Sequence, residues 1–211
     1  MKIESDQIEI FSGVRHGSTL GSPIAFIVHN KDWVNWSEIM SAEPNPEGAE
    51  KRLVTRPRPG HADLVGALKY GFDDMRNVLE RSSARETTSR VAVGGFCRLL
   101  LRELGIQIYS HVVSIKDIRI SNEQLEKVSS DLIPKIESSE MRCSDPSLDE
   151  AMKKAVDEAI EKGETIGGTF EVRATGVPPG LGSYVHWDRK LDGRLAQAMM
   201  SINAIKGVDV G

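Results

Sequence analysis

The sequence predicts an α+β fold, in which strands and helices do not form repeated strand–helix units. Strand-like segments occur near the N-terminus and again in the second half of the chain, and helical periodicity lies between and after them. The regular alternation that builds a parallel sheet is missing from this pattern. Because 211 residues can bury one good core, we expect a single domain over residues 1–211.

Two short strands are predicted first, over residues 7–13 and 22–29. The second contains the apolar run AFIV (25–28), which indicates either a strand buried on both faces or an edge strand near the core. Irregular structure is expected over residues 30–60, because prolines restrict the backbone there at Pro44, Pro46, Pro57 and Pro59.

Two helices and a strand are predicted to follow. The first helix begins near Ala62, since apolar residues recur at steps of three and four on one face: Leu64, Leu68, Phe72, Met75 and Leu79. The second helix covers residues 89–103 and stops at Gly105, with four apolar residues facing inward: Phe96, Leu99, Leu100 and Leu104. Residues 106–115 are typical of a strand.

The last third of the chain predicts a helix, a strand and a final helix. Asp145 can cap the first of these helices, Pro146 suits its first position, and Gly163 ends it. Residues 169–175 alternate as a strand, which places on one side Phe170, Val172 and Ala174. The final helix carries four apolar residues in register: Leu191, Leu195, Met199 and Ile202.

Composition and charge exclude several functional classes. The net charge of −4 at pH 7 argues against nucleic acid or an anionic membrane as the partner of the whole surface. No apolar run approaches the roughly 20 residues of a membrane span, and the N-terminus lacks the apolar segment of a signal peptide. Cys97 and Cys143 have neither CxxC spacing nor nearby histidines, so we expect reduced cytoplasmic thiols and no metal site.

Positive charge collects in one region of the chain, where residues 76–102 contain six arginines. This suits a small anionic ligand better than a long polyanion, although a solvated basic helix face would have the same composition. Within it, the stretch RSSARETTSR (81–90) adds hydroxyl donors that can wrap a phosphate or a polar ring edge. It is neither a P-loop nor a GxGxxG motif, and a polar connection between two helices is the alternative.

The segment TRPRPGHADLV (55–65) combines two arginines, two prolines and a histidine before the first predicted helix. The prolines fix the backbone around Arg56 and Arg58, so these side chains lose little further freedom when a ligand binds. Guanidinium groups match phosphate and carboxylate oxygens, and the helix start beyond His61 favours an anion. The segment predicts a site for an acidic small molecule beside a histidine; a surface turn whose histidine caps the helix is the alternative.

Four stretches taken together resemble the chorismate synthase family: SGVRHGSTLGSPIAFIVHNKDW, VTRPRPGHADL, RSSARETTSRVAVGGFCRLLL and GLGSYVHWDRKLDGRLAQAMMSINAIKGV. The resemblance runs in order over nearly all 211 residues, and these motifs are long and specific to the family. It implies a β-α-β sandwich, which this chain would form incompletely, and a cytoplasmic homotetramer.

The resemblance also implies a lyase of aromatic amino acid biosynthesis, in the shikimate pathway. Such an enzyme converts 5-enolpyruvylshikimate 3-phosphate into chorismate and phosphate by a 1,4-anti elimination. It requires reduced FMN although the reaction has no net redox change, and NADP is a further nucleotide associated with the family. The substrate carries one phosphate and two carboxylates, which accounts for arginines that converge on one site.

The family motifs assign roles to individual residues of this chain. His61 matches the histidine that protonates the reduced flavin, and Ser83 matches a catalytic serine near flavin and substrate. The flavin-binding residues that the resemblance implies are Arg81, Ser82, Ser83, Asn203 and Ala204. As ligands of the substrate anions we add Arg58 and Arg85.

The family is longer than this chain at both ends. Its members carry a G-E-S-H-G motif with a second catalytic histidine before the position of Met1. Further flavin-binding loops and a late aspartate follow the position of Gly211. We therefore expect a fragment, for which the alternative function is that of a catalytically inactive structural piece. Unpaired strand edges would then make the fragment prone to association.

Overall fold

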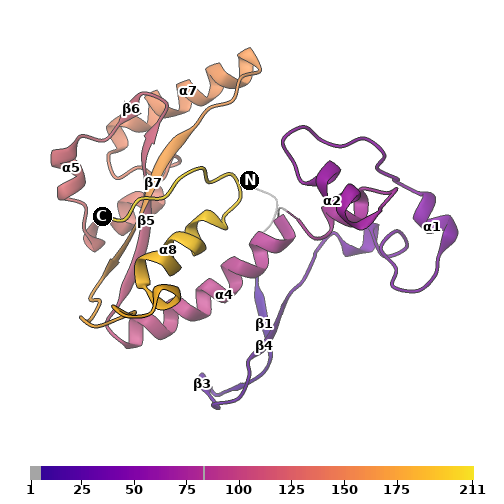
Figure 1. The fold of residues 1–211 in the computed structure, drawn as a ribbon, viewed down its shortest axis with the longest axis horizontal. Coiled ribbons are helices and arrows are strands. Elements are labelled where there is room, and N and C mark those ends of the chain that lie inside the picture. The colour runs from indigo at the N-terminus through magenta and orange to yellow at the C-terminus, as the bar shows by residue number, and fades with distance from the viewer. Residues whose placement is uncertain (1–5, 83) are drawn as a thin grey trace. The chain divides into compact units, whose positions relative to one another are not determined.

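The computed structural model describes residues 6–82 and 84–211, and it confirms an α+β fold (Figure 1). The first half of the chain contains β1 (Ile8–Ser12), β2 (Val14–Arg15), β3 (Ser18–Thr19), β4 (Ala25–Val28), η1 (Trp33–Asn35), α1 (Pro46–Glu50), α2 (Asp63–Tyr70), α3 (Arg76–Leu79) and α4 (Ala84–Glu103). The second half contains β5 (Gln107–Ile115), β6 (Ile118–Arg119), α5 (Asn122–Glu126), η2 (Ser130–Leu132), α6 (Ile133–Ser138), η3 (Pro146–Leu148), α7 (Asp149–Lys162), β7 (Gly168–Thr175), η4 (Trp187–Arg189) and α8 (Leu191–Met200).

Contacts divide the chain into two compact units. The first unit comprises Met1–Phe96 and Ser201–Lys206, and the second comprises Cys97–Met200 and Gly207–Gly211. The chain passes from one unit to the other within the continuous helix α4. The expectation of one domain over residues 1–211 stays a prediction.

The first unit begins with an antiparallel hairpin in which β1 and β4 run side by side (Figure 1). Both strands lie where the sequence predicts them. The prediction that residues 25–28 are buried on both faces is wrong, because their side chains alternate between exposed and half-buried in a two-stranded sheet. The alternative of an edge strand holds, since Phe26 packs on Phe96 with ring centroids 5.0 Å apart.

The proline-rich stretch is less irregular than predicted. α1 forms within it because Pro46 occupies a first-turn position, where a missing N–H costs nothing, and Asn45 caps the helix. The Asn45 side chain accepts the Gly48 N–H at 3.0 Å. A proline therefore starts a short helix here instead of preventing one.

The helix predicted near Ala62 starts in the expected place but ends early. Gly71 adopts a left-handed φ of 67° and its N–H bonds to the Ala67 carbonyl, which closes α2 at Tyr70. The prediction of one apolar face reaching Leu79 is therefore wrong, and α3 forms separately. The buried face of α2 contains Asp63 and Ala67 instead of the predicted leucines, and Leu68 is 76% exposed.

α4 begins at Ala84, five residues before the predicted start, and ends at Glu103 before Gly105, which has a left-handed φ of 77°. The predicted stop is therefore confirmed. The predicted inward direction is wrong for three leucines, which are exposed: Leu99, Leu100 and Leu104. Among the described residues of α4 only Ala92 is buried, so nothing packed on this helix covers these leucines.

The second unit is built on an antiparallel sheet in the order β6-β5-β7 (Figure 1). β5 and β7 pair along their lengths, with Val112 opposite Phe170 and a bulge between Val112 and Ser114. The most deeply buried apolar cluster of this unit contains three side chains with no exposed surface: Ile120, Cys143 and Met152. Partly buried residues from the sheet, from α5 and from η3 pack around this cluster.

Helix caps in the second unit follow the sequence closely. Asp145 accepts the Ser147 N–H at 3.0 Å, but the turn that begins at Pro146 is a 3₁₀ turn, and the α-helix starts at Asp149. Gly163 ends α7 in a left-handed conformation, as predicted. The final helix, α8, stops at Met200, so Ile202 lies outside it and its predicted place in the helix is wrong.

Candidate functional site

The candidate site is built around the turn that precedes α2. Arg58 donates to Asp63 three times: from its backbone N–H to Oδ2 at 2.9 Å, from Nε to Oδ2 at 2.9 Å, and from Nη2 to Oδ1 at 3.0 Å. The Asp63 side chain has no exposed surface, whereas 45% of the Arg58 side chain is exposed. One buried carboxylate therefore holds both the backbone and the head group of Arg58.

This ion pair determines the charge of Asp63. The side-chain hydrogen bonds from Arg58 lower the pKa of the Asp63 carboxyl to about 2, and the charge of His61 acts in the same direction. Burial opposes this shift, because desolvation disfavours the ionised form. Asp63 is therefore ionised at neutral pH, and it is the counter-charge of the turn.

In the sequence, His61 lies between Arg58 and Asp63, the two members of the ion pair. Gly60 has a left-handed φ of 73°, which permits the reversal, and the His61 N–H donates to the Arg58 carbonyl at 3.3 Å. α2 then begins at Asp63, with Ala62 as its N-cap, so the predicted location of His61 at a helix start is confirmed. The imidazole is exposed to solvent.

The chain before the turn is fixed by Asp74. One Asp74 oxygen accepts the N–H groups of Val54 at 3.0 Å and of Arg76 at 2.9 Å. The Met75 N–H bonds to the Val54 carbonyl at 2.9 Å. These bonds hold Val54, which precedes the turn, against the residues at the start of α3.

α3 connects the turn to the next predicted segment. Gly66 on α2 lies against Val78 on α3 so closely that a Cβ at Gly66 would be 2.4 Å from a Val78 methyl carbon. α3 leads directly into Arg81, which is exposed, and Ser82, which is half-buried. Ser83 lies outside the described residues, so its predicted role is not addressed by the structure.

Arg85 stands in the first turn of α4. Its Nε lies 2.5 Å from a carboxylate oxygen of Glu80, and 45% of its side chain is exposed. Arg85 therefore has an acidic partner within the chain, as Arg58 does. Both arginines that were expected to bind substrate anions already hold one carboxylate each.

The segment that contains Asn203 and Ala204 is joined to α4 by a long-range contact at Ser201. Arg90 on α4 donates from Nη1 to the Ser201 carbonyl at 3.1 Å and to the Ser201 hydroxyl at 2.8 Å. Ala204 has a left-handed φ of 67° in the turn that follows. Arg90 lies about 9 Å along the helix from Ala84, so the structure brings the 201–206 segment to the helix that begins beside Arg81 and Ser82.

The described site residues therefore all lie in the first unit, joined by a series of contacts. That series runs from the 58–63 ion pair through the Gly66–Val78 contact to α4 and then to Ser201. Sequence analysis missed the ion-pair role of Asp63 and the roles of Asp74 and Glu80. The only sequence signal was the proximity of these acids to the arginine-rich stretches.

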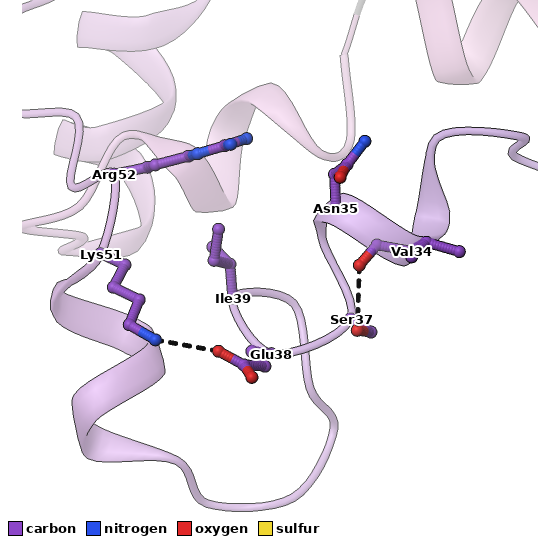
Figure 2. Close-up of a pocket in the computed structure, with 7 residues that line it drawn as sticks. All are labelled: Val34, Asn35, Ser37, Glu38, Ile39, Lys51 and Arg52. Carbon is purple, nitrogen blue, oxygen red and sulfur yellow. Dashed lines mark hydrogen bonds and ion pairs between the residues drawn. The ribbon is translucent and has the colours of Figure 1, made fainter.

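A separate hollow lies elsewhere in this unit (Figure 2). It has a volume of about 430 Å³ and is lined by Val34, Asn35, Ser37, Glu38, Ile39, Lys51 and Arg52. Lys51 and Glu38 point toward each other across it and form an ion pair of 2.9 Å (Figure 2). Arg52 stacks on Trp36, with its guanidinium carbon 4.5 Å from the ring centroid. The predicted site residues do not line this hollow.

The donors next to the start of α4 suit an oxyanion. Guanidinium and hydroxyl groups are present at Arg81 and Ser82, and an α-helix leaves its first N–H groups unpaired by the helix itself. In residues 6–82 and 84–211, no three His, Cys, Asp or Glu side chains gather as a possible metal site. No helix in that described part is long and apolar enough to cross a membrane.

Comparison with known proteins gives one consistent family. The family model described as chorismate synthase matches residues 1–211. A chorismate synthase of Alkaliphilus metalliredigens (strain QYMF) is 56% identical over 213 residues, and one of Brevibacillus brevis (strain 47) is 57% identical over 212 residues. Each match covers 100% of this chain and 54% of the relative, so the chain spans about half the length of these curated relatives.

A solved structure supports the same assignment. A crystal structure of chorismate synthase superposes with a TM-score of 0.77 at 47% sequence identity, covering 98% of this chain and 55% of that chain. The structural match therefore extends over nearly the whole chain, as the sequence matches do. This chain belongs to the chorismate synthase family.

Proposed function

We propose that the protein containing this chain is a chorismate synthase, a lyase that eliminates phosphate from 5-enolpyruvylshikimate 3-phosphate to give chorismate. The observation that carries this proposal is the family match over residues 1–211, which includes the complete turn of Arg58, His61 and Asp63. We further propose that the enzyme uses reduced FMN, takes part in aromatic amino acid biosynthesis in the cytoplasm with NADP as an associated nucleotide, and forms a homotetramer. Residues 1–211 would form one domain of it.

The proposed substrate is a small polyanion, and the charge distribution of the first unit suits it. Arg58 and Arg85 would contact phosphate or carboxylate oxygens with the parts of their guanidinium groups that point to solvent. Each has a carboxylate partner in the chain, Asp63 and Glu80, which fixes its direction. Charge-assisted hydrogen bonds of this kind contribute about 1.5–3 kcal/mol each.

His61 would hold and move the proton that the reaction requires. Its ring is exposed and its backbone is fixed by the bond to the Arg58 carbonyl. Histidine is the side chain best suited to gain and lose a proton near neutral pH. The Arg58–Asp63 ion pair flanks His61 in the chain. Ser83 is the second proposed catalytic residue.

Arg81, Ser82, Ser83, Asn203 and Ala204 would hold the flavin. Arg81 and the hydroxyls near the start of α4 suit its phosphate, and the Asn203 amide suits a polar edge of its ring. When bound, reduced FMN would supply the transient reducing equivalent that the elimination needs. The contact between Arg90 and Ser201 holds the start of the 201–206 segment on α4.

The alternative is that the 211-residue chain by itself is a catalytically inactive structural piece. The coverage of 54% of the relatives' length favours this alternative, because residues from the uncovered part of those relatives have no counterpart here. The family and the chain's own activity are therefore separate questions.

Measuring phosphate release under anaerobic conditions tests both the proposed function and the inactive-piece alternative. We expect the 211-residue chain, supplied with reduced FMN and 5-enolpyruvylshikimate 3-phosphate, to release phosphate at no more than the background rate. A longer protein that contains this sequence should turn over. Robust turnover by the 211-residue chain would overturn the inactive-piece alternative, and no turnover by the longer protein would overturn the proposed function.

In the active protein, His61→Ala should lower turnover by at least about a hundredfold, because general acid–base groups contribute factors of this size. His29→Ala is the matched control, since His29 is also exposed and pairs with Glu9 at 2.6 Å in the β1–β4 hairpin. The control should keep near-normal turnover. A near-normal rate in His61→Ala would remove His61 from the proton-transfer role.

A further inference from the structure

The Arg58 guanidinium has two edges, and Asp63 occupies only one of them. A guanidinium carries five N–H groups in a fixed planar fork. Nε and Nη2 each donate one of them to Asp63, at 2.9 Å and 3.0 Å. The opposite edge, formed by Nη1 and the second Nη2 hydrogen, has the geometry for paired contacts with another oxyanion.

The two partners of this ion pair differ in burial, which leaves the second edge of the guanidinium accessible. Asp63 has no exposed surface, whereas 45% of the Arg58 side chain is exposed. The carboxylate is therefore the fixed inner member, and the guanidinium extends from it to the surface. Similar exposure is found for other paired arginines, such as Arg142 at 44%, but Arg58 differs from it in that its acidic partner is fully buried.

The same carboxylate also fixes the backbone of the turn. Asp63 Oδ2 accepts the Arg58 backbone N–H as well as Nε–H, and the His61 N–H donates to the Arg58 carbonyl. Gly60, with its left-handed φ of 73°, completes the reversal between them. The direction of the guanidinium and the position of His61 are therefore set by one buried acid.

We infer that Asp63 is a positioning residue that holds Arg58 so that its second edge binds an oxyanion beside His61. The oxyanion is a phosphate or a carboxylate, and the inference rests on the proposed function for the identity of the substrate that carries it. Positioning of this kind lowers the entropy that binding must offset, because the long arginine side chain is already ordered. Asp63 itself does not touch the ligand.

The substitution Asp63→Asn tests the positioning role of Asp63 in the 211-residue chain. It keeps the size of the side chain, removes its charge and turns one acceptor into a donor. Inorganic phosphate and acetate are titrated separately while the Arg58 Nε–H signal is followed by ¹H–¹⁵N NMR. We expect the unmodified chain to show a saturable shift, and Asp63→Asn to bind about tenfold more weakly or worse, which corresponds to about 1.4 kcal/mol. Asp73→Asn, an exposed acid nearby, should leave the affinity unchanged.

The two anions distinguish the possible ligand groups. A saturable response to phosphate alone assigns the edge to a phosphate, and a response to acetate alone assigns it to a carboxylate. No saturable response of the unmodified chain to either anion would overturn the inference. Equal affinities for Asp63→Asn and the unmodified chain would overturn it as well.

A double-mutant cycle separates positioning from general support of the fold. Followed at the His61 backbone signal, Asp63→Asn should weaken anion binding in the unmodified chain but not in the Arg58→Ala background. The same weakening in both backgrounds would show that Asp63 does not act through Arg58. If Asp63→Asn loses its folded spectrum, Arg58→Lys decides: it keeps the charge but loses the paired edge, and unchanged affinity would overturn the inference.

Turnover gives an independent readout in the longer, active protein. Asp63→Asn should raise KM for the substrate by about tenfold with a smaller change in kcat, as expected for loss of a binding contact. A fall in kcat at unchanged KM would contradict this. If the unmodified protein shows no turnover, the proposed function fails, while the anion titrations still decide the role of Asp63.

Discussion

The second unit buries large apolar side chains around Ile120 and Met152, whereas the buried apolar side chains in the described part of the first unit are small. Those of the first unit are Ala67, Val78 and Ala92. The first unit instead buries a carboxylate, Asp63, and uses a second one, Asp74, to fix two backbone N–H groups. One unit is therefore stabilised mainly by apolar burial and the other largely by directed polar contacts.

This difference suits the roles proposed for the two units. Apolar burial is strong but has no preferred direction, so it suits the second unit, in which no site residue was predicted. Hydrogen bonds and ion pairs are directional, so they suit the turn that fixes Arg58 and His61. The candidate site therefore lies in the unit whose order depends most on charge.

The largest expected effect on stability is in the second unit. Met152→Ala removes a side chain with no exposed surface from the Ile120 cluster, and it should lower the free energy of unfolding by about 2–5 kcal/mol. Hydrogen exchange measured by peptide should locate the loss in the second unit. Met200→Ala, at an exposed position, should change stability by less than about 0.5 kcal/mol. An equal loss in both variants would contradict the comparison.

Acid should next reveal the dependence of the first unit on charge. Because Arg58 lowers the pKa of Asp63 from 3.8 to about 2, the ionised acid stabilises the fold above about pH 4. That contribution should be lost as the pH falls from about 4 toward 2, since the folded state then binds fewer protons than the unfolded state. Thermal unfolding of the unmodified chain and of Asp63→Asn should therefore converge over this range. A constant difference would contradict the ion-pair assignment.

Close packing between α2 and α3 gives a smaller effect. Gly66→Ala would place a Cβ 2.4 Å from a Val78 methyl carbon, so it should destabilise the first unit by about 1–3 kcal/mol. Gly94→Ala is the matched control, because nothing lies within 4 Å of its added Cβ and alanine favours a helix interior. The control should stabilise α4 by up to about 1 kcal/mol. Chemical denaturation measures both, and the same sign for the two variants would reject the contact.

The smallest effect is expected at a helix cap of the second unit. The Ser121 side chain accepts the Gln124 N–H, and the Gln124 side chain accepts the Ser121 N–H, which together form a capping box at α5. Ser121→Ala should cost about 1 kcal/mol. Thr165→Ala, an exposed loop position, should change unfolding by less than half of this amount. A loss as large as that of Met152→Ala would mean that local caps, and not apolar burial, dominate the second unit.

Local signals in the sequence were reliable where one residue decides the outcome. Asp145 and Gly163 act as predicted at the ends of the helical segment, and strands form where they are predicted over residues 7–13 and 169–175. The same signals failed where packing decides. The apolar periodicity across α2 and α3 was read as one helix, although the left-handed Gly71 separates the two. Periodicity alone does not reveal such a break, because Phe72 and Met75 continue the pattern by spacing only.

The candidate site was predictable as a set of residue types and not as an arrangement. The sequence indicated that Arg58 and His61 belong to one stiff turn, and the two prolines explain why. It did not indicate that Asp63 is buried beneath that turn or that Glu80 pairs with Arg85. These pairs depend on side-chain directions that spacing does not specify.

The sequence by itself determined the fold class, most element positions and the membership of a family, because these depend on local propensity and on long motifs. Only the tertiary structure decided which arginine edge is occupied, which acid is buried, and how Ser201 meets Arg90 across more than a hundred residues. The physical reason is that hydrogen bonds and ion pairs require particular distances and directions in space. Residues far apart in the chain acquire these only when the backbone has folded.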